Sequence, residues 1–448
     1  MRINCLKDVK KIYFIGIGGV SMSALAKFLS INGYEVAGSD AQKCEMTENL
    51  VFYNIKVSIG EDENREELLK ADIVVYTDAI SESNKELIRA RCMNKKLYSR
   101  MELLSLIAKE FKHVLAIAGS HGKTTCTAMC AHVLKYTQIP FMAHIGGMDL
   151  LLGNFFCSGY DYLITEACEY KKNLLKLDVE TAVLLNIDKD HMECYQDEHD
   201  LIETFYMYCN RAKTAFVCAD DEKCVKLGGF STFGIQNVLS DYRAVNLRSN
   251  GEKYSFAIEE YGTPIAWVKL NAIGRCNIYN ALATFAALRS FGFSGDEVAK
   301  GLESFIAVKR RFERIGGYNG ASFICDYAHH PKEILSTFLT AKSVCRKKVY
   351  VVFQPHTYSR TKLLWTEFLN VLRSIDNLMI YKTYPARELY DAEGAAEHLA
   401  NAVGCLYAEN IYVLKMWIKR TVKEGDIVIF LGAGDIYYAA QYLLNELK

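Results

Sequence analysis

Gly119-Ser120-His121-Gly122-Lys123-Thr124-Thr125 follows the apolar run 114–118 and leads into a helical stretch, Cys126–Tyr136. A strand that ends in a glycine turn and opens a helix is typical of a phosphate-binding loop, because backbone N–H groups and the helix N-terminus converge on the anion. Ile117 stands where the usual G-x-x-x-x-G-K-[ST] loop has its first glycine, so the shorter G-x-x-G-K-T remains. The alternative is a glycine turn without a ligand. The lysine and the hydroxyl groups favour ATP with a magnesium ion.

The composition is that of a globular protein. The chain has 448 residues, half of them hydrophobic, with 53 basic and 53 acidic side chains. This balance gives no reason to expect a nucleic-acid or membrane partner. Fifteen cysteines without a C-x-x-C pair indicate reduced thiols. The start of the chain has no apolar signal region, and no run approaches the roughly 18 residues of a membrane span. We expect a cytoplasmic monomer or homodimer.

The length and the alternation of strands and helices predict an α/β protein with three domains. We expect a Rossmann-like domain at residues 1–110, a central P-loop ATPase-like parallel-sheet domain at 111–306 and a Rossmann-like domain at 307–448. A two-periodic stretch at residues 242–270 indicates an antiparallel insertion or sheet edge. The other predicted strands are 11–17, 34–38, 72–76, 114–118, 162–165, 182–187, 215–218, 322–325, 348–353, 378–381 and 427–431.

A second glycine turn opens the first domain. Gly16-Ile17-Gly18-Gly19-Val20-Ser21 joins a strand to a helix, with Ser21 where the dinucleotide fingerprint has its third glycine. Asp40 ends the next strand, as a ribose-binding carboxylate does. The turn favours a nucleotide diphosphate, either NAD or a UDP-sugar. The alternative is a tight turn that only packs a helix on a sheet.

Polar residues follow two further strands, at Thr165-Glu166-Ala167-Cys168-Glu169-Tyr170 and Asn186-Ile187-Asp188-Lys189-Asp190-His191. Open parallel sheets bind ligands at the carboxyl ends of their strands. Acidic and histidine side chains there are candidate magnesium ligands. Solvated or helix-capping carboxylates are the alternative.

In this order the motifs resemble the Mur ligase family over essentially the whole chain. The most specific are E-A-C-E-Y, D-Y-A-H-H-P and Q-P-H, which generic nucleotide binding does not require. The matching motifs are G-I-G-G-V-S-M-S at Gly16, G-S-H-G-K-T-T at Gly119, E-A-C-E-Y at Glu166, N-I-D-x-D-H at Asn186, G-R-C-N-I-Y-N at Gly274, R-R-F at Arg310, D-Y-A-H-H-P at Asp326, F-Q-P-H-x-x-S-R at Phe353, Y-P-A-R-E at Tyr384 and L-G-A-G-D at Leu431.

The resemblance implies an ATP-dependent ligase of peptidoglycan precursor synthesis. In the alanine-adding branch, the carboxylate of UDP-N-acetylmuramate attacks the γ-phosphorus of ATP to give an acyl phosphate. The amine of L-alanine then displaces phosphate, which leaves UDP-N-acetylmuramoyl-L-alanine, ADP and phosphate. The segment 200–205 lacks the lysine that other branches carbamylate to hold magnesium, which agrees with the alanine-adding branch.

The resemblance also implies roles for single residues. The implied catalytic residues are Lys123, Glu166, His191, Arg311, His329, His356 and Arg360. The implied metal ligands are Thr124, Glu166 and His191. ATP contacts are expected from residues 119–125, Asn277 and Asn280 at the adenine, Arg311 at the phosphates and Asp326 at the ribose. The UDP-sugar contacts are Gly16, Gly18, Gly19, Val20, Ser21 and Asp40. The amino-acid contacts are Tyr327, His329, His356 and Arg360. Between His356 and Arg360 the chain has Thr357-Tyr358-Ser359, where the family usually has Arg-Phe-Thr.

Three alternatives remain at this stage. A related ligase attaches a recycled peptide to the same UDP-sugar and differs mainly in its acceptor pocket. An NAD-dependent oxidoreductase would use the first glycine turn but leaves Lys123 and Glu166 without a role. A non-catalytic binding subunit on a Mur ligase scaffold would not need Lys123, Glu166 and His191 together.

Overall fold

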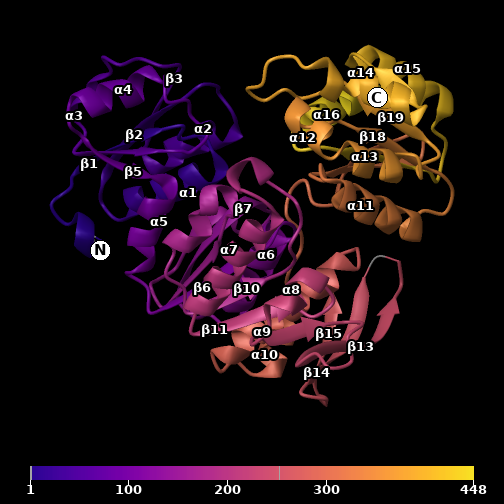
Figure 1. The fold of residues 1–448 in the computed structure, drawn as a ribbon, viewed down its shortest axis with the longest axis horizontal. Coiled ribbons are helices and arrows are strands. Elements are labelled where there is room, and N and C mark those ends of the chain that lie inside the picture. Colours follow the sequence, from indigo (N-terminus) through magenta and orange to yellow (C-terminus); the bar gives the residue numbers. More distant parts are fainter. Residues whose placement is uncertain (1–2, 252, 448) are drawn as a thin grey trace. The chain divides into compact units, whose positions relative to one another are not determined.

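The computed structural model of the protein describes residues 3–251 and 253–447. Within these residues it contains three β-sheets, each accompanied by helices (Figure 1). Residues 1–2 and 448, at the outer limits of the predicted first and third domains, lie outside the described part. The α/β class predicted from the sequence is confirmed. The chain divides into two compact units. The first contains residues up to 248 with 255–271 and 277–306, and the second contains residues from 307 onward with short segments near 250 and 274.

The first sheet is parallel, with strand order β3-β2-β1-β4-β5. The strand order reverses at β1, and open parallel sheets bind ligands outside the carboxyl ends of their strands at such a reversal, which is where the glycine turn follows β1. The strands are β1 (Lys11–Ile15), β2 (Glu35–Asp40), β3 (Lys56–Ile59), β4 (Ile73–Tyr76) and β5 (Lys96–Ser99). The helices are α1 (Val20–Ile31), α2 (Glu45–Asn49), α3 (Glu66–Lys70), α4 (Lys85–Cys92) and α5 (Arg100–Ala108).

The second sheet has the order β15-β14-β13-β12-β11-β10-β6-β9-β7-β8. Its strands are β6 (His113–Ala118), β7 (Phe141–Asp149), β8 (Gly153–Cys157), β9 (Tyr162–Glu166), β10 (Thr181–Leu184), β11 (Thr214–Cys218), β12 (Ser231–Gly234), β13 (Tyr242–Ser249), β14 (Tyr254–Glu260) and β15 (Thr263–Leu270). Its helices are α6 (Lys123–Tyr136), α7 (Glu198–Arg211), α8 (Glu222–Leu227), α9 (Cys276–Ser290) and α10 (Gly295–Glu303). Because β9 and β10 flank β6, the loops after these three strands meet at one edge.

The strands of the stretch 242–270 form one end of this sheet, which agrees with the predicted edge. The hairpin of β7 and β8 was not predicted. Gly146 and Gly147 interrupt the apolar pattern of β7. Because glycine is uncommon in strands, both residues make a strand prediction for this segment less favourable. A Cβ at Gly146 would lie 2.4 Å from Glu166 Oε1, so a side chain there would require the Glu166 carboxylate to move. The interruption therefore reflects close packing at the end of β9.

The third sheet has the order β16-β17-β21-β18-β19-β20 and is parallel except for β16. Helices α11 and α13 run along one side of β18 and β19 (Figure 1), while α15 and α16 pack on the opposite face. The strands are β16 (Glu313–Tyr318), β17 (Ala321–Asp326), β18 (Val349–Phe353), β19 (Leu378–Tyr381), β20 (Leu406–Ala408) and β21 (Ile427–Leu431). The helices are α11 (Pro331–Val344), α12 (Tyr358–Leu363), α13 (Trp365–Leu372), α14 (Ala396–Val403), α15 (Ile411–Thr421) and α16 (Ile436–Leu447).

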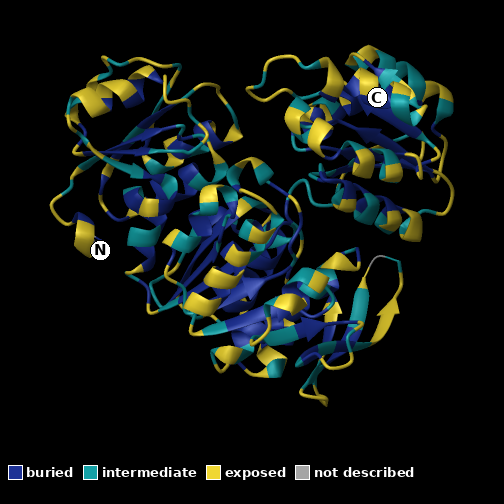
Figure 2. Ribbon diagram, viewed as in Figure 1, coloured by how far each residue is buried: buried dark blue, intermediate teal, exposed yellow. Residues whose placement is uncertain are grey.

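One apolar core joins the first two sheets. Helix α1 buries Leu25 and Phe28 in a cluster that also contains Met142 of β7 and Phe155 of β8. The rings of Phe28 and Phe155 meet edge to face with centroids 6.4 Å apart. Central parallel strands such as β10, β18 and β21 are buried on both faces (Figure 2), as expected where helices cover a sheet. Within the described residues, no helix is long and apolar enough to span a membrane.

A buried polar pair holds helix α6 in the second sheet. His132 Nε2 lies 3.1 Å from Asp149 Oδ2, and both side chains are fully buried. His132 Nδ1 lies 3.0 Å from the carbonyl oxygen of Ser304, next to α10. Asp149 also accepts hydrogen bonds from the backbone N–H groups of Leu151 and Leu152. The pair therefore ties α6 to the turn of the β7–β8 hairpin.

We predict that His132→Leu lowers the free energy of unfolding by about 3 kcal/mol or more, because a buried carboxylate loses its partner. Chemical denaturation measures the change. The matched control is His199→Gln on the exposed surface of α7, which we expect to change stability by less than about 0.5 kcal/mol. Equal unfolding midpoints for the two variants would contradict the structural role of His132.

Candidate functional site

The loop between β6 and α6 has the backbone of a phosphate cradle. Gly119 (φ +130°) and Gly122 (φ +86°) adopt conformations that favour glycine, and Gly122 caps the N-terminus of α6. A Cβ at Gly122 would lie 2.7 Å from Asn280 Oδ1, and one at Gly119 would lie 3.1 Å from the backbone N of Asn186. Both glycines are therefore required by close packing as well as by backbone conformation.

The N-I-D-x-D-H motif after β10 shapes this loop. Asn186 Oδ1 accepts a hydrogen bond of 2.8 Å from the backbone N of His121, and Asn186 Nδ2 donates to the carbonyl of His121. The backbone N of Asp188 donates to Ser120 Oγ at 2.8 Å. His121 Nε2 lies 3.0 Å from Asp188 Oδ2. Asn186 and Asp188 were quoted in the sequence motif without this role, which depends on the adjacency of β10 and β6.

Lys123 has a carboxylate partner inside the loop. Its Nζ donates to both oxygens of Glu169 at 3.0 Å, and also to the carbonyls of Gly119 and Ser120. The side chains of Lys123 and Glu169 are only 15% and 2% exposed. Burial opposes the charge on Lys123, but the neighbouring acidic groups, with Glu169 foremost, together outweigh it, and the pKa of the ammonium lies above its ordinary value. The lysine is therefore charged and held at the mouth of the cradle.

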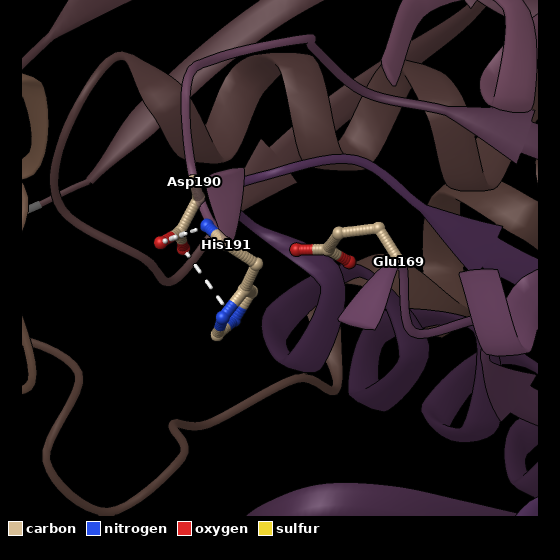
Figure 3. Close-up of side chains that lie close together, drawn as sticks. All are labelled: Glu169, Asp190 and His191. Atoms are coloured by element: carbon tan, nitrogen blue, oxygen red, sulfur yellow. Dashed lines mark hydrogen bonds and ion pairs between the residues drawn. The ribbon is translucent and has the colours of Figure 1, made fainter. Parts of the chain in front are cut away.

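Glu169 also belongs to a set of side chains that suits a metal ion. Its carboxylate, a carboxylate oxygen of Asp190 and a ring nitrogen of His191 all lie within 4.8 Å of one another. Figure 3 shows that the Glu169 side chain extends toward Asp190 and His191. His191 adopts φ +54°, its backbone N donates to Asp190 Oδ1 at 3.0 Å, and its ring meets Tyr170 edge to face. Two hard oxygen ligands and an imidazole fit Mg²⁺ or Mn²⁺.

Of the predicted metal ligands, only His191 belongs to this set. The carboxylate of Glu166 accepts a 2.7 Å hydrogen bond from the backbone N of Gly146 instead. Thr124 is buried in the first turn of α6. Glu169 and Asp190 were included in the sequence analysis only as acidic side chains at two strand ends that could hold magnesium, and not in the ligand set implied by the resemblance.

The predicted adenine contacts lie beside the phosphate loop. Asn280 Nδ2 donates to Asn277 Oδ1 at 3.0 Å on helix α9. Since Asn280 also packs against Gly122, the structure brings these two asparagines to the predicted ATP loop.

The glycine turn after β1 is held by β2. The backbone N–H groups of Gly16 and Ile17 donate to the carbonyl of Ser39. The backbone N of Gly18 donates to Asp40 Oδ2 at 2.8 Å, and a Cβ at Gly18 would clash with that oxygen. Asp40, expected at a ribose, thus also holds the turn. Gly19 caps helix α1, which begins at Val20.

Ser21 makes contacts that the sequence did not indicate. Its Oγ lies 2.7 Å from His144 Nε2 on β7 and accepts a 3.0 Å hydrogen bond from Arg100 Nη1 on α5. Two distant elements therefore meet at the first turn of α1.

The third sheet gathers the predicted amino-acid contacts at the carboxyl ends of β17 and β18. The rings of His329 and His356 lie with centroids 5.9 Å apart, and Tyr327 meets His329 edge to face at 5.6 Å. Arg360 Nη1, on α12, lies 3.3 Å from His356 Nδ1. These four side chains therefore form one cluster, and their role as contacts of an amino acid stays a prediction.

The Y-P-A-R-E segment supports this cluster, a role that its motif did not reveal. The ring of Tyr384 stacks on His356 with centroids 5.5 Å apart. Glu388 Oε2 accepts hydrogen bonds from the backbone N–H groups of Tyr358 and Ser359. The segment Thr357-Tyr358-Ser359, which departs from the usual family pattern, is thus fixed by Glu388.

Asp326 ends β17, and Arg311 lies just before β16. Asp326 accepts hydrogen bonds from the backbone N–H groups of Phe312 at 2.7 Å and Ala328 at 2.8 Å. Burial raises the pKa of Asp326, and Arg311 opposes that rise. The Arg311 guanidinium lies 5.1 Å from the centre of the Tyr327 ring. Arg310, by contrast, donates to the carbonyls of Gly432 and Gly434 and is a structural residue.

Three domain models of the Mur ligase family match most of the chain. Residues 11–112 match the Mur ligase family catalytic domain, residues 117–288 match the Mur ligase middle domain, and residues 310–434 match the Mur ligase glutamate ligase domain.

Full-length relatives carry one name. The chain is 37% identical to the UDP-N-acetylmuramate–L-alanine ligase of Clostridium novyi, over 99% of this chain and all of that one. It is also 37% identical to the ligase of the same name from Clostridium acetobutylicum, over 98% of each chain. The solved UDP-N-acetylmuramate–alanine ligase of Thermotoga maritima is 28% identical, with a TM-score of 0.84 over 97% of this chain and 98% of that one. With motifs, sheets and full-length relatives in agreement, the chain belongs to the Mur ligase family.

Proposed function

We propose that the protein is an ATP-dependent ligase that joins L-alanine to the carboxylate of UDP-N-acetylmuramate, with Mg²⁺, in peptidoglycan precursor synthesis. The observation that carries the proposal is the match of 35–37% identity along 98–99% of the chain to ligases of that name. The products are UDP-N-acetylmuramoyl-L-alanine, ADP and phosphate. The geometry around Lys123 supports the ATP-dependent part.

In this mechanism the loop 119–125 binds the ATP phosphates through its backbone N–H groups and the N-terminus of α6. Lys123 turns its ammonium from Glu169 toward the β- and γ-phosphates, where it offsets negative charge as the muramate carboxylate attacks. Mg²⁺, when bound, supplies further positive charge at the phosphates. Glu169, Asp190 and His191 would hold the ion. Thr124 and Glu166 are further ligands that the resemblance implies.

The turn 16–19 is proposed to hold the diphosphate of the UDP-sugar at the N-terminus of α1, with Val20, Ser21 and Asp40 beside it. In the third domain, Arg360 is proposed to bind the carboxylate of L-alanine, because a guanidinium pairs with a carboxylate in a bidentate manner. Tyr327, His329 and His356 would orient the amine. Arg311 and Asp326 stay predicted contacts of ATP.

The experiment that tests the proposal is an assay of the purified full-length protein. ATP, Mg²⁺ and UDP-N-acetylmuramate are supplied with L-alanine, with each other amino acid in turn, or with the tripeptide of the recycling reaction, and phosphate release is measured. Release that depends on L-alanine supports the proposal. Release with the tripeptide alone would assign the related recycling ligase, and no release with any acceptor would leave the binding subunit.

We predict that Lys123→Ala lowers turnover at least about 100-fold while the fold is retained, a loss of roughly 2.7 kcal/mol of transition-state stabilisation. Phosphate release gives the rate, and circular dichroism checks the fold. The control is Lys112→Ala, since Lys112 is an exposed residue of the same domain that pairs with Asp161. Turnover of Lys123→Ala at the wild-type rate would refute the ATP-site assignment.

We predict that Gly18→Val raises the KM for UDP-N-acetylmuramate and leaves the binding of an ATP analogue nearly unchanged. The added side chain would meet Asp40 and Thr47, which close the turn. Steady-state kinetics and calorimetry with the analogue measure the two effects. If the variant loses the ATP analogue and keeps the sugar, the two glycine turns have been assigned the wrong way round.

We predict that Glu169→Gln and His191→Ala each weaken Mn²⁺ binding to the nucleotide-free protein at least about tenfold, because each removes a ligand from a small set. Electron paramagnetic resonance reports the free Mn²⁺. Glu203→Gln, on the exposed face of α7, is the control. If Glu166→Gln loses Mn²⁺ and Glu169→Gln retains it, the ligand set predicted from the sequence is the correct one.

A further inference from the structure

Four side chains from four elements form a continuous hydrogen-bonded series next to the proposed sites. Arg100 Nη1 donates to Ser21 Oγ at 3.0 Å, and Ser21 Oγ lies 2.7 Å from His144 Nε2. His144 Nδ1 lies 2.8 Å from Thr165 Oγ1, and Thr165 Oγ1 donates to the carbonyl of Glu166 at 3.3 Å. His144 and Thr165 are buried, at 2% and 0% exposure. The series thus runs from α5 through α1 and β7 to the end of β9.

The direction of each hydrogen bond follows from the Thr165 end of the series. Thr165 has one hydroxyl proton, and because it donates this proton to the Glu166 carbonyl, Thr165 Oγ1 accepts from His144 Nδ1. A neutral imidazole that carries its proton on Nδ1 accepts at Nε2, so Ser21 donates to His144. Ser21 Oγ in turn accepts from Arg100, because a guanidinium only donates. Burial and the nearby Arg100 charge lower the pKa of His144 to about 3, so the ring is neutral near pH 7.

The two ends of the series are the parts of the molecule that the proposed reaction must bring into register. Ser21 is the second residue of α1, directly after the turn proposed to hold the diphosphate. Glu166 ends β9, and its carboxylate accepts a hydrogen bond from Gly146, two residues beyond His144 on β7. A segment of three residues, 144–146, therefore contacts both the UDP-sugar turn and a predicted metal ligand.

Further polar contacts join the same helix to the same hairpin. Lys27 Nζ, on α1, donates to Asn154 Oδ1 on β8 at 2.7 Å. Asn154 Nδ2 donates to the carbonyl of Val20 at 2.7 Å and to Ser23 Oγ at 2.8 Å. Lys27 thus holds the body of α1, whereas Asn154 and His144 both contact its first turn, at Val20 and Ser21. His144 differs from Asn154 because it also contacts Thr165 at the end of β9.

We propose that His144, as a neutral imidazole with its proton on Nδ1, is a positioning residue that fixes the UDP-sugar turn at residues 16–21 relative to Glu166. It touches no substrate and acts through Ser21 and Thr165. The proposal rests on the proposed function, since it assigns the turn to the UDP-sugar. Its consequence is that the muramate carboxylate reaches the γ-phosphate at the correct distance only while both hydrogen bonds of His144 are made, because small misplacements of reacting groups cost large factors in rate.

Kinetics of the full-length protein test the role. We expect His144→Leu to raise the KM for UDP-N-acetylmuramate and lower kcat, each about tenfold or more, while the KM for ATP changes less than about twofold. The control is His132→Leu, a buried histidine of the same domain outside the series. We expect it to lower the melting temperature and to leave all KM values of the folded protein unchanged. His144→Leu with wild-type KM and kcat would overturn the proposal.

Two carboxamide variants separate the two hydrogen bonds. The Gln side chain places its polar end near the position of Nε2, and the Asn side chain near that of Nδ1. We expect His144→Gln to keep the contact with Ser21 and most of the affinity for UDP-N-acetylmuramate, and His144→Asn to lose that affinity. Equal effects of the two variants would show that His144 only fills space.

A double-mutant cycle tests whether the series transmits position. We expect Ser21→Ala and Thr165→Val to be coupled in kcat/KM for UDP-N-acetylmuramate by at least about threefold, and to be additive when His144 is replaced by Leu. Thr204→Val is the control, because Thr204 is a buried hydroxyl on α7 that also donates to a backbone carbonyl. Additivity of Ser21→Ala and Thr165→Val in the wild-type background would contradict the proposal.

One measurement does not depend on activity. Nitrogen-15 NMR of histidine-labelled protein distinguishes the two neutral tautomers and the imidazolium ion. We expect His144 to stay neutral with its proton on Nδ1 from pH 8 to pH 5, and His144→Leu to identify its signals. A proton on Nε2, or an imidazolium at pH 6, would refute the series. A wild-type protein with this tautomer but no ligase activity would refute the proposed function and leave the series intact.

Discussion

The ion pair of Lys123 and Glu169 is the interaction on which the central domain depends. Two nearly buried charges are tolerated only when each finds its partner, and loss of one leaves the other uncompensated. The pair joins the loop after β6 to the loop after β9. The hydroxyl of Tyr195 also holds Glu169, because it donates a hydrogen bond to the backbone carbonyl of that residue. The phosphate cradle is therefore ordered by the protein's own carboxylate.

This arrangement has a consequence for the reaction. In the proposed mechanism, a ligand phosphate would compete with Glu169 for the same ammonium, so the binding of ATP would replace one anionic partner of Lys123 with another. Glu169 already lies close to Asp190 and His191, so a divalent cation held by these three side chains would then balance its charge. Exchange of this kind keeps every buried charge paired in both states, which is the condition for a buried charged site to be stable.

The sequence predicted the parts of the fold that local patterns encode. Buried parallel strands such as β6 and β18 read as short apolar runs, and the glycine turns of Gly18 and Gly122 stand where their close contacts require them. The sequence pattern did not predict β7, because Gly146 and Gly147 interrupt it. Gly146 lies in close contact with Glu166 on β9. A contact between residues 20 apart in sequence leaves no periodic signal.

The same reasoning explains which site residues were found. Lys123 was predicted because its type and its place after a glycine turn carry the chemistry, whereas His356 and Arg360 were predicted from the resemblance to the Mur ligase family. Glu169 and Tyr384 stand in quoted motifs, yet their roles depend on which strands are neighbours. His144 stands in no quoted motif, and only the meeting of β7 with α1 and β9 gives it two hydrogen-bond partners. Strand order, which places residues from distant segments in contact, therefore decides how much of such a site a single sequence can predict.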